Sequence, residues 1–170
     1  MGFCFQCGSI LSSLWMENRQ REVCPRCGWV YYPQLKVSAA AMVVKENRLL
    51  LVRRATPPWK GCWYLPAGYV EADEDPACAA ERELLEETGL IARVDGLFGA
   101  YFFDDDPRGN GLLLVYRLVL IGGSLSLNGE ADGAGFFEAH RLPAPLTSAG
   151  HDRAVAEWVA RVKNNRGLRQ

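Results

Sequence analysis

Short apolar runs, separated by turn-forming and charged residues, make up most of the chain and predict a strand-rich protein. Val37 to Lys45 is a nearly continuous apolar run, Glu46-Asn47 is typical of a turn, and Arg48 to Arg54 is the expected hairpin partner. Three later segments also predict strands: Ala92 to Phe103 with a bend at Gly96 or Gly99, Leu112 to Ile121, and a short strand beginning at Phe136-Phe137. Between them we expect a polar loop over Asp104 to Gly111 and a glycine-rich acidic loop over Asn128 to Gly135.

Two segments have helical spacing. Asp75-Pro76 is typical of an N-cap followed by the first helical residue, and Gly89 of the stop, which leaves about four turns between them. We expect one side of this helix to face inward: Leu84 and Leu85, supported by Ala77, Cys78, Ala80 and Thr88. A second helix is predicted over Gly150 to Val162. Strands around two helices indicate an α+β fold or an α/β sandwich.

Four of the six cysteines have the spacing of a zinc site. Cys4, Cys7, Cys24 and Cys27 form C-x2-C-x16-C-x2-C, and a glycine follows the second cysteine of each pair. Four thiolates complete a closed tetrahedral site, which is structural rather than catalytic. The segment resembles a zinc ribbon, with chance spacing or a redox pair as the alternatives. We therefore predict a ribbon over residues 1–34 and a second domain over 35–170.

The remaining cysteines and the two histidines have no metal-ligand spacing. We interpret Cys62 and Cys78 as ordinary small residues, buried or half-buried. His140 and His151 stand alone in the sequence, and we interpret both as structural or surface residues.

Negative charge is concentrated between Gly68 and Leu90. Eight residues there are acidic and only Arg82 is basic. Glu83 is three residues from Glu86 and four from Glu87, so the three carboxylates point to one surface of the predicted helix. Magnesium prefers such oxygen ligands and keeps waters that substrate phosphates can displace. The alternative is a solvated acidic helix.

The same stretch resembles the Nudix box, a signature of the form GX5EX7REUXEEXGU in which U is a bulky aliphatic residue. All nine specified positions match: Gly68, Glu74, Arg82, Glu83, Leu84, Glu86, Glu87, Gly89 and Leu90. The resemblance implies the Nudix fold, an α/β/α sandwich with a mixed sheet, over about residues 36 to 165. It also implies metal-dependent hydrolysis of a nucleoside diphosphate linked to another moiety.

By this resemblance Glu83, Glu86 and Glu87 hold Mg²⁺ or Mn²⁺, and the carbonyl of Ala67 or Gly68 adds a ligand. Arg82 is expected to pair with a nearby carboxylate and fix its rotamer, and Glu74 to orient the turn into the helix. Two sources of the general base stay open, a box glutamate or a residue of a later loop. The loop candidate is Glu130, with Glu138 as a weaker one.

Substrate choice depends on weaker signals. Leu65-Pro66-Ala67-Gly68 resembles the LPAG run of ADP-ribose and FAD pyrophosphatases. The NADH pyrophosphatase branch carries SQPWPFPxS after its box, whereas this chain reads AYFFDDDPRGNG, which disfavours NADH and NAD-capped RNA. Arginines are expected to meet phosphates and aromatic rings to stack on the organic groups: Arg53, Arg54, Trp63, Tyr69 and Phe103.

Composition and charge narrow the possible partners. The net charge of −1 gives no electrostatic case for binding long nucleic acid. No segment resembles a signal peptide or is long enough to span a bilayer, so we expect a cytoplasmic protein. The resemblance to the Nudix box implies a small nucleotide substrate. A homodimer stays open, since dimers are common in the family. Alternative functions are hydrolysis of a nucleoside triphosphate, NADH or a capped RNA, or a silent nucleotide-binding regulator, which the intact glutamates disfavour.

Overall fold

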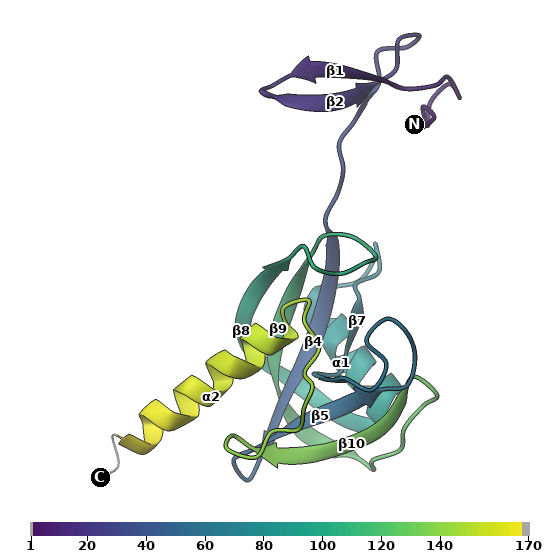
Figure 1. Ribbon diagram of the computed structural model, residues 1–170. Helices are drawn as coiled ribbons and strands as arrows, with labels where there is room; N and C mark the ends of the chain where they lie inside the picture. Colours follow the sequence, from purple (N-terminus) through teal and green to yellow (C-terminus); the bar gives the residue numbers. More distant parts are fainter. Residues whose placement is uncertain (1, 168–170) are drawn as a thin grey trace. The chain divides into compact units, whose positions relative to one another are not determined.

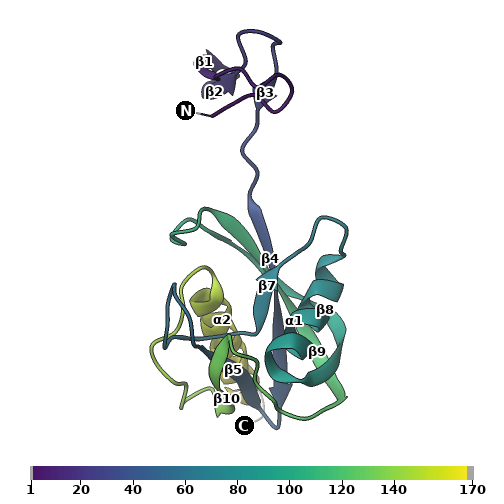
Figure 2. The same cartoon turned by 90° about the vertical axis from the view of Figure 1, so that its right-hand side faces the viewer.

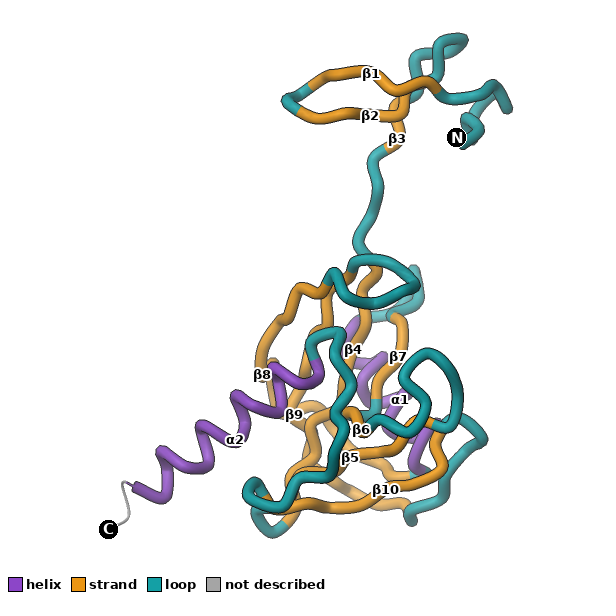
Figure 3. The backbone as a smooth tube through the Cα atoms, in the orientation of Figure 1, coloured by secondary structure: helices purple, strands orange, loops and turns teal. Residues whose placement is uncertain are grey.

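A computed structural model describes residues 2–167, and the chain divides into two compact units, Met1–Leu35 and Lys36–Gln170. The smaller unit is a three-stranded antiparallel sheet in the order β1 (Ser12–Met16), β2 (Arg19–Val23), β3 (Val30–Tyr31) (Figure 3). Its buried core consists of Leu11 and two of the cysteines, Cys4 and Cys24. Such a small core cannot stabilise the unit by apolar burial alone.

The larger unit is built on a mixed sheet (Figure 1). Its strands are β4 (Lys36–Lys45), β5 (Arg48–Arg54), β6 (Trp63–Tyr64), β7 (Ala67–Tyr69), β8 (Leu90–Phe103), β9 (Gly111–Gly123) and β10 (Ala131–Glu138). The main order is β10-β5-β4-β9-β8, while β6 pairs with β5 and β7 with β4. The β4–β9 pair is parallel and the other pairs are antiparallel.

The helices α1 (Pro76–Thr88) and α2 (His151–Gly167) lie on opposite faces of this sheet (Figure 2). Alternate residues of β4 point to opposite faces. Ala39, Ala41 and Val43 pack in the core that contains α1 residues, whereas Ala40 and Met42 pack in the core that contains α2 residues. The arrangement confirms the predicted α/β/α sandwich with its mixed sheet.

The ends of α1 follow the predicted signals. The Asp75 side chain accepts a hydrogen bond from the Ala77 amide at 2.8 Å, and Pro76 is the first helical residue. Gly89 adopts a left-handed conformation with φ 69° and donates to the Leu85 carbonyl. Glycine is favoured here because an L side chain is strained at such a φ value.

The inward face of α1 differs from the prediction in two places. Leu85 is 48% exposed and Cys78 is also exposed, whereas Glu87 is buried with Leu84. Each helical residue turns about 100° from the previous one, so Leu84 and Leu85 cannot both point to the centre of the sheet. The face instead contains Glu87, which is 1% exposed.

Two strand predictions also need correction. The predicted loop over Asn128 to Gly135 is wrong after Glu130, because β10 begins at Ala131 and pairs with β5. Its glycines hide the strand pattern in the sequence, and only the pairing with β5 reveals it. In β8 the register shifts before both Gly96 and Gly99, so the strand is irregular at each of the two predicted sites.

Candidate active site

A cavity of about 390 Å³ brings the acidic face of α1 together with residues from several loops. Glu83, Glu86 and Glu87 all line it, as do Ala67 and Gly68 of β7. The turn before α1 and the pairing of β7 with β4 place the box loop beside the helix. The structure thus brings together all five residues that the sequence assigned to a Mg²⁺ or Mn²⁺ site.

Glu87 is a buried carboxylate with two protein donors. The Tyr64 hydroxyl donates to Oε1 at 2.8 Å, and the Ala67 amide donates to Oε2 at 3.2 Å. Burial nevertheless raises the pKa of Glu87 to about 8, with smaller contributions from the charges of Glu83 and Glu130. A cation beside this carboxylate would offset the burial and keep it ionised.

Gly68 lets the box loop approach Glu83 closely. A Cβ atom at Gly68 would lie 2.1 Å from Oε1 of Glu83, closer than any real contact. Burial raises the pKa of Glu83, although the Arg82 guanidinium opposes this by donating to Oε1 at 2.6 Å. A glycine is therefore needed at this position if Glu83 is to keep its place in the cavity.

Arg82 ties the loop to the helix. Its Nε and one terminal nitrogen donate to the two oxygens of Glu74 at 2.9 and 2.8 Å, and it also donates to the Tyr69 carbonyl at 3.1 Å. The same side chain contacts Glu83 and, at 3.3 Å, Glu86. Arg82 has the expected geometry of a residue that positions carboxylates, and Glu74 that of its anchor.

The donor set fits a divalent cation. All of the side-chain ligands would be carboxylate oxygens, which hard cations prefer. Among the residues that the structure describes, buried Glu87 is hydrogen-bonded only to neutral groups, the Tyr64 hydroxyl and the Ala67 amide. Because Arg82 already contacts Glu83 and Glu86, a bound cation would share these carboxylates with the guanidinium. Such a cation would supply charge neutralisation and a more acidic bound water.

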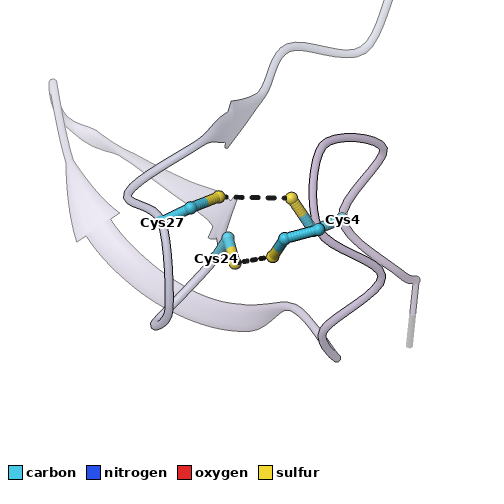
Figure 4. A group of neighbouring side chains, drawn as sticks. Cys4, Cys24 and Cys27 are labelled. Atoms are coloured by element: carbon cyan, nitrogen blue, oxygen red, sulfur yellow. Dashed lines mark hydrogen bonds between the residues drawn. The ribbon is translucent and has the colours of Figure 1, made fainter.

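The side chains of the four cysteines of the smaller unit point toward one another (Figure 4). Their sulfur atoms lie within 4.8 Å of one another, and the closest pairs are Cys7–Cys24 at 3.4 Å and Cys4–Cys27 at 3.5 Å. A tetrahedral site with Zn–S bonds of about 2.3 Å has sulfurs about 3.8 Å apart. The cluster therefore fits one zinc ion with little movement.

The backbone around the cysteines is built from two matching turns. The Gly8 amide donates to the Cys4 carbonyl at 2.9 Å and the Gly28 amide to the Cys24 carbonyl at 3.0 Å. Both glycines, which follow the second cysteine of each pair, have positive φ, 70° and 76°, a conformation that glycine adopts readily. Hydrogen bonds with Ser9 lower the pKa of the Cys7 thiol to about 6, which favours the thiolate that a metal requires.

The pKa of the Cys27 thiol shifts in the opposite direction to that of Cys7. A backbone hydrogen bond from Trp29 lowers its pKa, but desolvation and the three other sulfurs raise it overall, to about 12. Four thiolates at these distances repel one another unless a cation lies between them.

The predicted substrate contacts are only partly brought together. Arg54, Tyr69, Phe103 and Glu130 line the cavity. Arg53 and Trp63 are not among the lining residues; Arg53 donates to Asp132 at 2.7 Å, and Trp63 packs against Phe137 with ring centroids 5.0 Å apart. Neighbouring residues of a strand point to opposite faces, so Arg53 and Arg54 cannot both enter the cavity.

Other residues at the cavity gave little or no sequence signal. Arg108 is held by Asp106, to which it donates at 2.7 Å, and its guanidinium lies 5.7 Å from the Trp59 ring centre and 5.6 Å from that of Tyr69. His151, interpreted from the sequence as structural or surface, is 8% exposed and lines the cavity.

Glu138, the weaker candidate for the general base, does not line the cavity and lies beside Arg48 and His140.

The hydrogen bond from Tyr64 to Glu87 yields a direct test of positioning. We expect Tyr64→Phe to weaken the apparent affinity for Mg²⁺ or to lower activity by roughly 10- to 100-fold, because an outer donor orients the carboxylate. The ring packing is kept, so unfolding should shift little. A metal titration of hydrolysis measures the effect, and an unchanged half-saturating Mg²⁺ concentration and rate would contradict the role.

Comparisons with known proteins show the family of the chain. Residues 34–159 match the NUDIX domain family and residues 2–33 match the Nudix N-terminal zinc-ribbon family, so the chain belongs to the Nudix hydrolases. Enzymes of this family use a divalent metal.

Two curated relatives and one solved structure illustrate the similarity. ADP-ribose pyrophosphatase from Methanocaldococcus jannaschii is 39% identical over 124 residues, 72% of each chain. NAD-capped RNA hydrolase NudC from Chromobacterium violaceum is 34% identical over 165 residues, covering 95% of this chain and 60% of that protein. A NUDIX hydrolase structure from Nitrosomonas europaea superposes with a TM-score of 0.81 at 26% identity, covering 94% of this chain and 91% of that one.

Among the described residues, no helix is both long enough and apolar enough to cross a membrane.

Proposed function

We propose that the protein hydrolyses the diphosphate bond of a nucleoside diphosphate linked to another moiety, of the ADP-ribose or FAD type. The products are a nucleoside monophosphate and a phosphorylated second product. The observation that supports this most is the cavity in which the box glutamates face arginine and aromatic side chains. The similarity to an ADP-ribose pyrophosphatase at 39% identity supports the same substrate class.

In this proposal Glu83, Glu86 and Glu87 hold Mg²⁺ or Mn²⁺ with the carbonyl of Ala67 or Gly68. When bound, the cation polarises a phosphoryl oxygen and acidifies the attacking water. Tyr64 and Arg82 keep the carboxylates in place, through the hydrogen bonds described above.

Glu130 lines the same cavity and can accept the proton of the attacking water. Its backbone is fixed close to Arg54, since its carbonyl accepts from the Ala55 amide at 2.8 Å. A box glutamate remains the alternative base, so Glu130→Gln separates the two: a large loss of kcat favours Glu130.

The organic ends of the substrate have separate partners. Arg54 and Arg108 supply positive charge for phosphate oxygens. Trp59, Tyr69 and Phe103 line the cavity and provide rings for stacking, with Tyr69 being 39% exposed. These contacts are general, so we expect graded preference among dinucleotides.

A second candidate is hydrolysis of NADH or an NAD-capped RNA end. The observation in its favour is that similarity to NudC extends over 95% of this chain, and so includes the ribbon. Against it stands the AYFFDDDPRGNG sequence after the box, which departs from the NADH pyrophosphatase motif.

A substrate panel with Mg²⁺ or Mn²⁺ distinguishes these functions. We expect ADP-ribose and FAD to be split to AMP plus ribose 5-phosphate or FMN. Reaction in ¹⁸O-water should label one phosphate product and leave every carbon–oxygen bond intact. The panel also includes NADH, an NAD-capped RNA and nucleoside triphosphates. If NADH, the NAD-capped RNA or a nucleoside triphosphate is turned over at least tenfold more efficiently than every other dinucleotide tested, the ADP-ribose assignment is wrong.

A further inference from the structure

Three residues that line the cavity carry a buried polar atom without a hydrogen-bond partner. Four buried side-chain nitrogen or oxygen atoms among the described residues have no hydrogen-bond partner. One is in the ribbon, and three belong to residues that line the cavity: Arg54 Nε, Thr147 Oγ1 and His151 Nδ1. Thr147 is 3% exposed and His151 is 8% exposed, so bulk water does not compensate them. A buried polar group without a partner is destabilising, and natural proteins keep few of them.

Arg54 is the last residue of β5, whereas Thr147 and His151 lie four residues apart, before and at the start of α2. Arg54 and His151 both lie against the ring of Tyr64. The guanidinium carbon of Arg54 lies 5.7 Å from the centre of the Tyr64 ring, and the His151 ring packs edge-on against the same ring at 5.7 Å. The Thr147 amide donates to the Trp63 carbonyl at 2.8 Å, which fixes Thr147 beside the same strand. The Tyr64 hydroxyl in turn contacts Glu87, so this group of residues is one side chain away from the proposed metal ligands.

The side chains of Arg54, Thr147 and His151 together favour a ligand that accepts hydrogen bonds. Arg54 Nε can only donate, and the hydroxyl of Thr147 and one ring nitrogen of a neutral imidazole can also donate. His151 is the first residue of α2, where the helix dipole favours negative charge. Burial lowers the pKa of His151 to about 4, and the nearby positive charges of Arg54 and Arg108 contribute in the same direction.

We propose that Arg54, Thr147 and His151 form a subsite for a phosphoryl group of the substrate, beside the metal-binding carboxylates. This inference rests on the proposed diphosphate substrate and assigns one phosphate to three protein side chains, where the sequence suggested Arg53 and Arg54 as the phosphate contacts. The helix N-terminus contributes only its dipole, because the amides of His151, Asp152 and Arg153 already have acceptors. A phosphoryl group has enough acceptor oxygens for all three residues to donate to it at once, whereas a single sugar hydroxyl does not.

Binding to products tests the subsite without turnover. The probes are AMP and ribose 5-phosphate, measured by calorimetry with Mg²⁺ present, and their phosphate-free counterparts adenosine and ribose. Thr147→Val removes the hydroxyl at nearly constant shape, and His151→Phe keeps a ring against Tyr64. Each change is expected to weaken binding of at least one phosphorylated probe by about 10- to 100-fold, the range of a hydrogen bond to a charged group. Thr147→Ser keeps the hydroxyl and is the matched control, with affinity close to wild type.

Thermal unfolding separates a ligand site from a structural role. Since the Thr147 hydroxyl is unpartnered, Thr147→Val without ligand should be at least as stable as wild type while binding phosphate more weakly. Unchanged affinities in both variants would overturn the subsite. So would an equal loss for adenosine or ribose, no phosphate-dependent binding by the wild type, or a lower unfolding temperature of Thr147→Val with normal binding. Failure of the proposed function is separate: it would appear as no dinucleotide hydrolysis while the phosphate probes still bind.

Discussion

Replacing Glu87 by glutamine is expected to lower hydrolysis by roughly 10³-fold or more, with Glu86→Gln having a similar effect. Either change removes one negative charge from the cluster that holds the cation, which weakens cation binding and misplaces the attacking water. A loss of several kcal/mol of transition-state stabilisation corresponds to a factor of this size. Initial rates with ADP-ribose at saturating Mg²⁺ or Mn²⁺ measure it. Wild-type rates in either variant would refute the assignment of the box glutamates.

The matched control is Glu81→Gln. Glu81 lies on the same helix but does not line the cavity, and its oxygens accept from Arg93 and the Val94 amide. Glutamine keeps one acceptor oxygen, so the fold and the activity of this variant should remain close to wild type. A large loss in Glu81→Gln would indicate that any charge change on α1 impairs the enzyme.

The stability of Glu87→Gln should change in the opposite direction to its activity. The pKa of Glu87 is raised from 4.5 to about 8 in the folded protein, so folding favours the protonated carboxyl. This contribution to stability is complete below about pH 4.5 and is lost as the pH rises through 8. Without added Mg²⁺ or Mn²⁺, the unfolding temperature of the wild type should therefore fall between pH 5 and 8, and that of Glu87→Gln should fall less. Parallel curves for the two proteins would contradict the buried environment of Glu87.

Replacing Cys24 by serine is expected to remove most of the bound zinc and to unfold the ribbon. Cys24 is 1% exposed and belongs to a core whose other buried members are Cys4 and Leu11. Apparent zinc-binding free energies of roughly 10–16 kcal/mol in small zinc domains show that such a unit depends on its metal. Metal analysis gives the stoichiometry, one zinc per wild-type chain and much less in the variant. Hydrogen exchange over residues 2–33 reports the loss of structure.

Catalysis should survive this change at least in part, because the box glutamates belong to the other unit, Lys36–Gln170. Cys78→Ser is the control: Cys78 is exposed and outside the cluster, so zinc content should not change. A wild-type protein that contains no zinc after purification without chelator would refute the zinc site.

Features set by neighbouring residues could be predicted from the sequence. The caps of α1, the turns at Gly8 and Gly28 and the spacing of the four cysteines depend on local hydrogen bonds and φ values. The box glutamates are also close in sequence, so the helical repeat alone placed them on adjoining patches of one surface. The α/β/α sandwich with its mixed sheet was predicted from the resemblance to the Nudix box.

Features set by distant residues were decided only by the tertiary structure. Which side of α1 is buried depends on where the sheet lies, and this exposes Leu85 and buries Glu87. Arg53 and Arg54 are adjacent in sequence, but the two faces of β5 separate them, so that only Arg54 lines the cavity. Thr147 and His151 gave no sequence signal because their place at the cavity depends on contacts with Trp63 and Tyr64, more than 80 residues earlier in the chain. Local sequence determines conformation over a few bonds, whereas a cavity is formed by sheet pairing and helix packing between segments that are far apart in the chain.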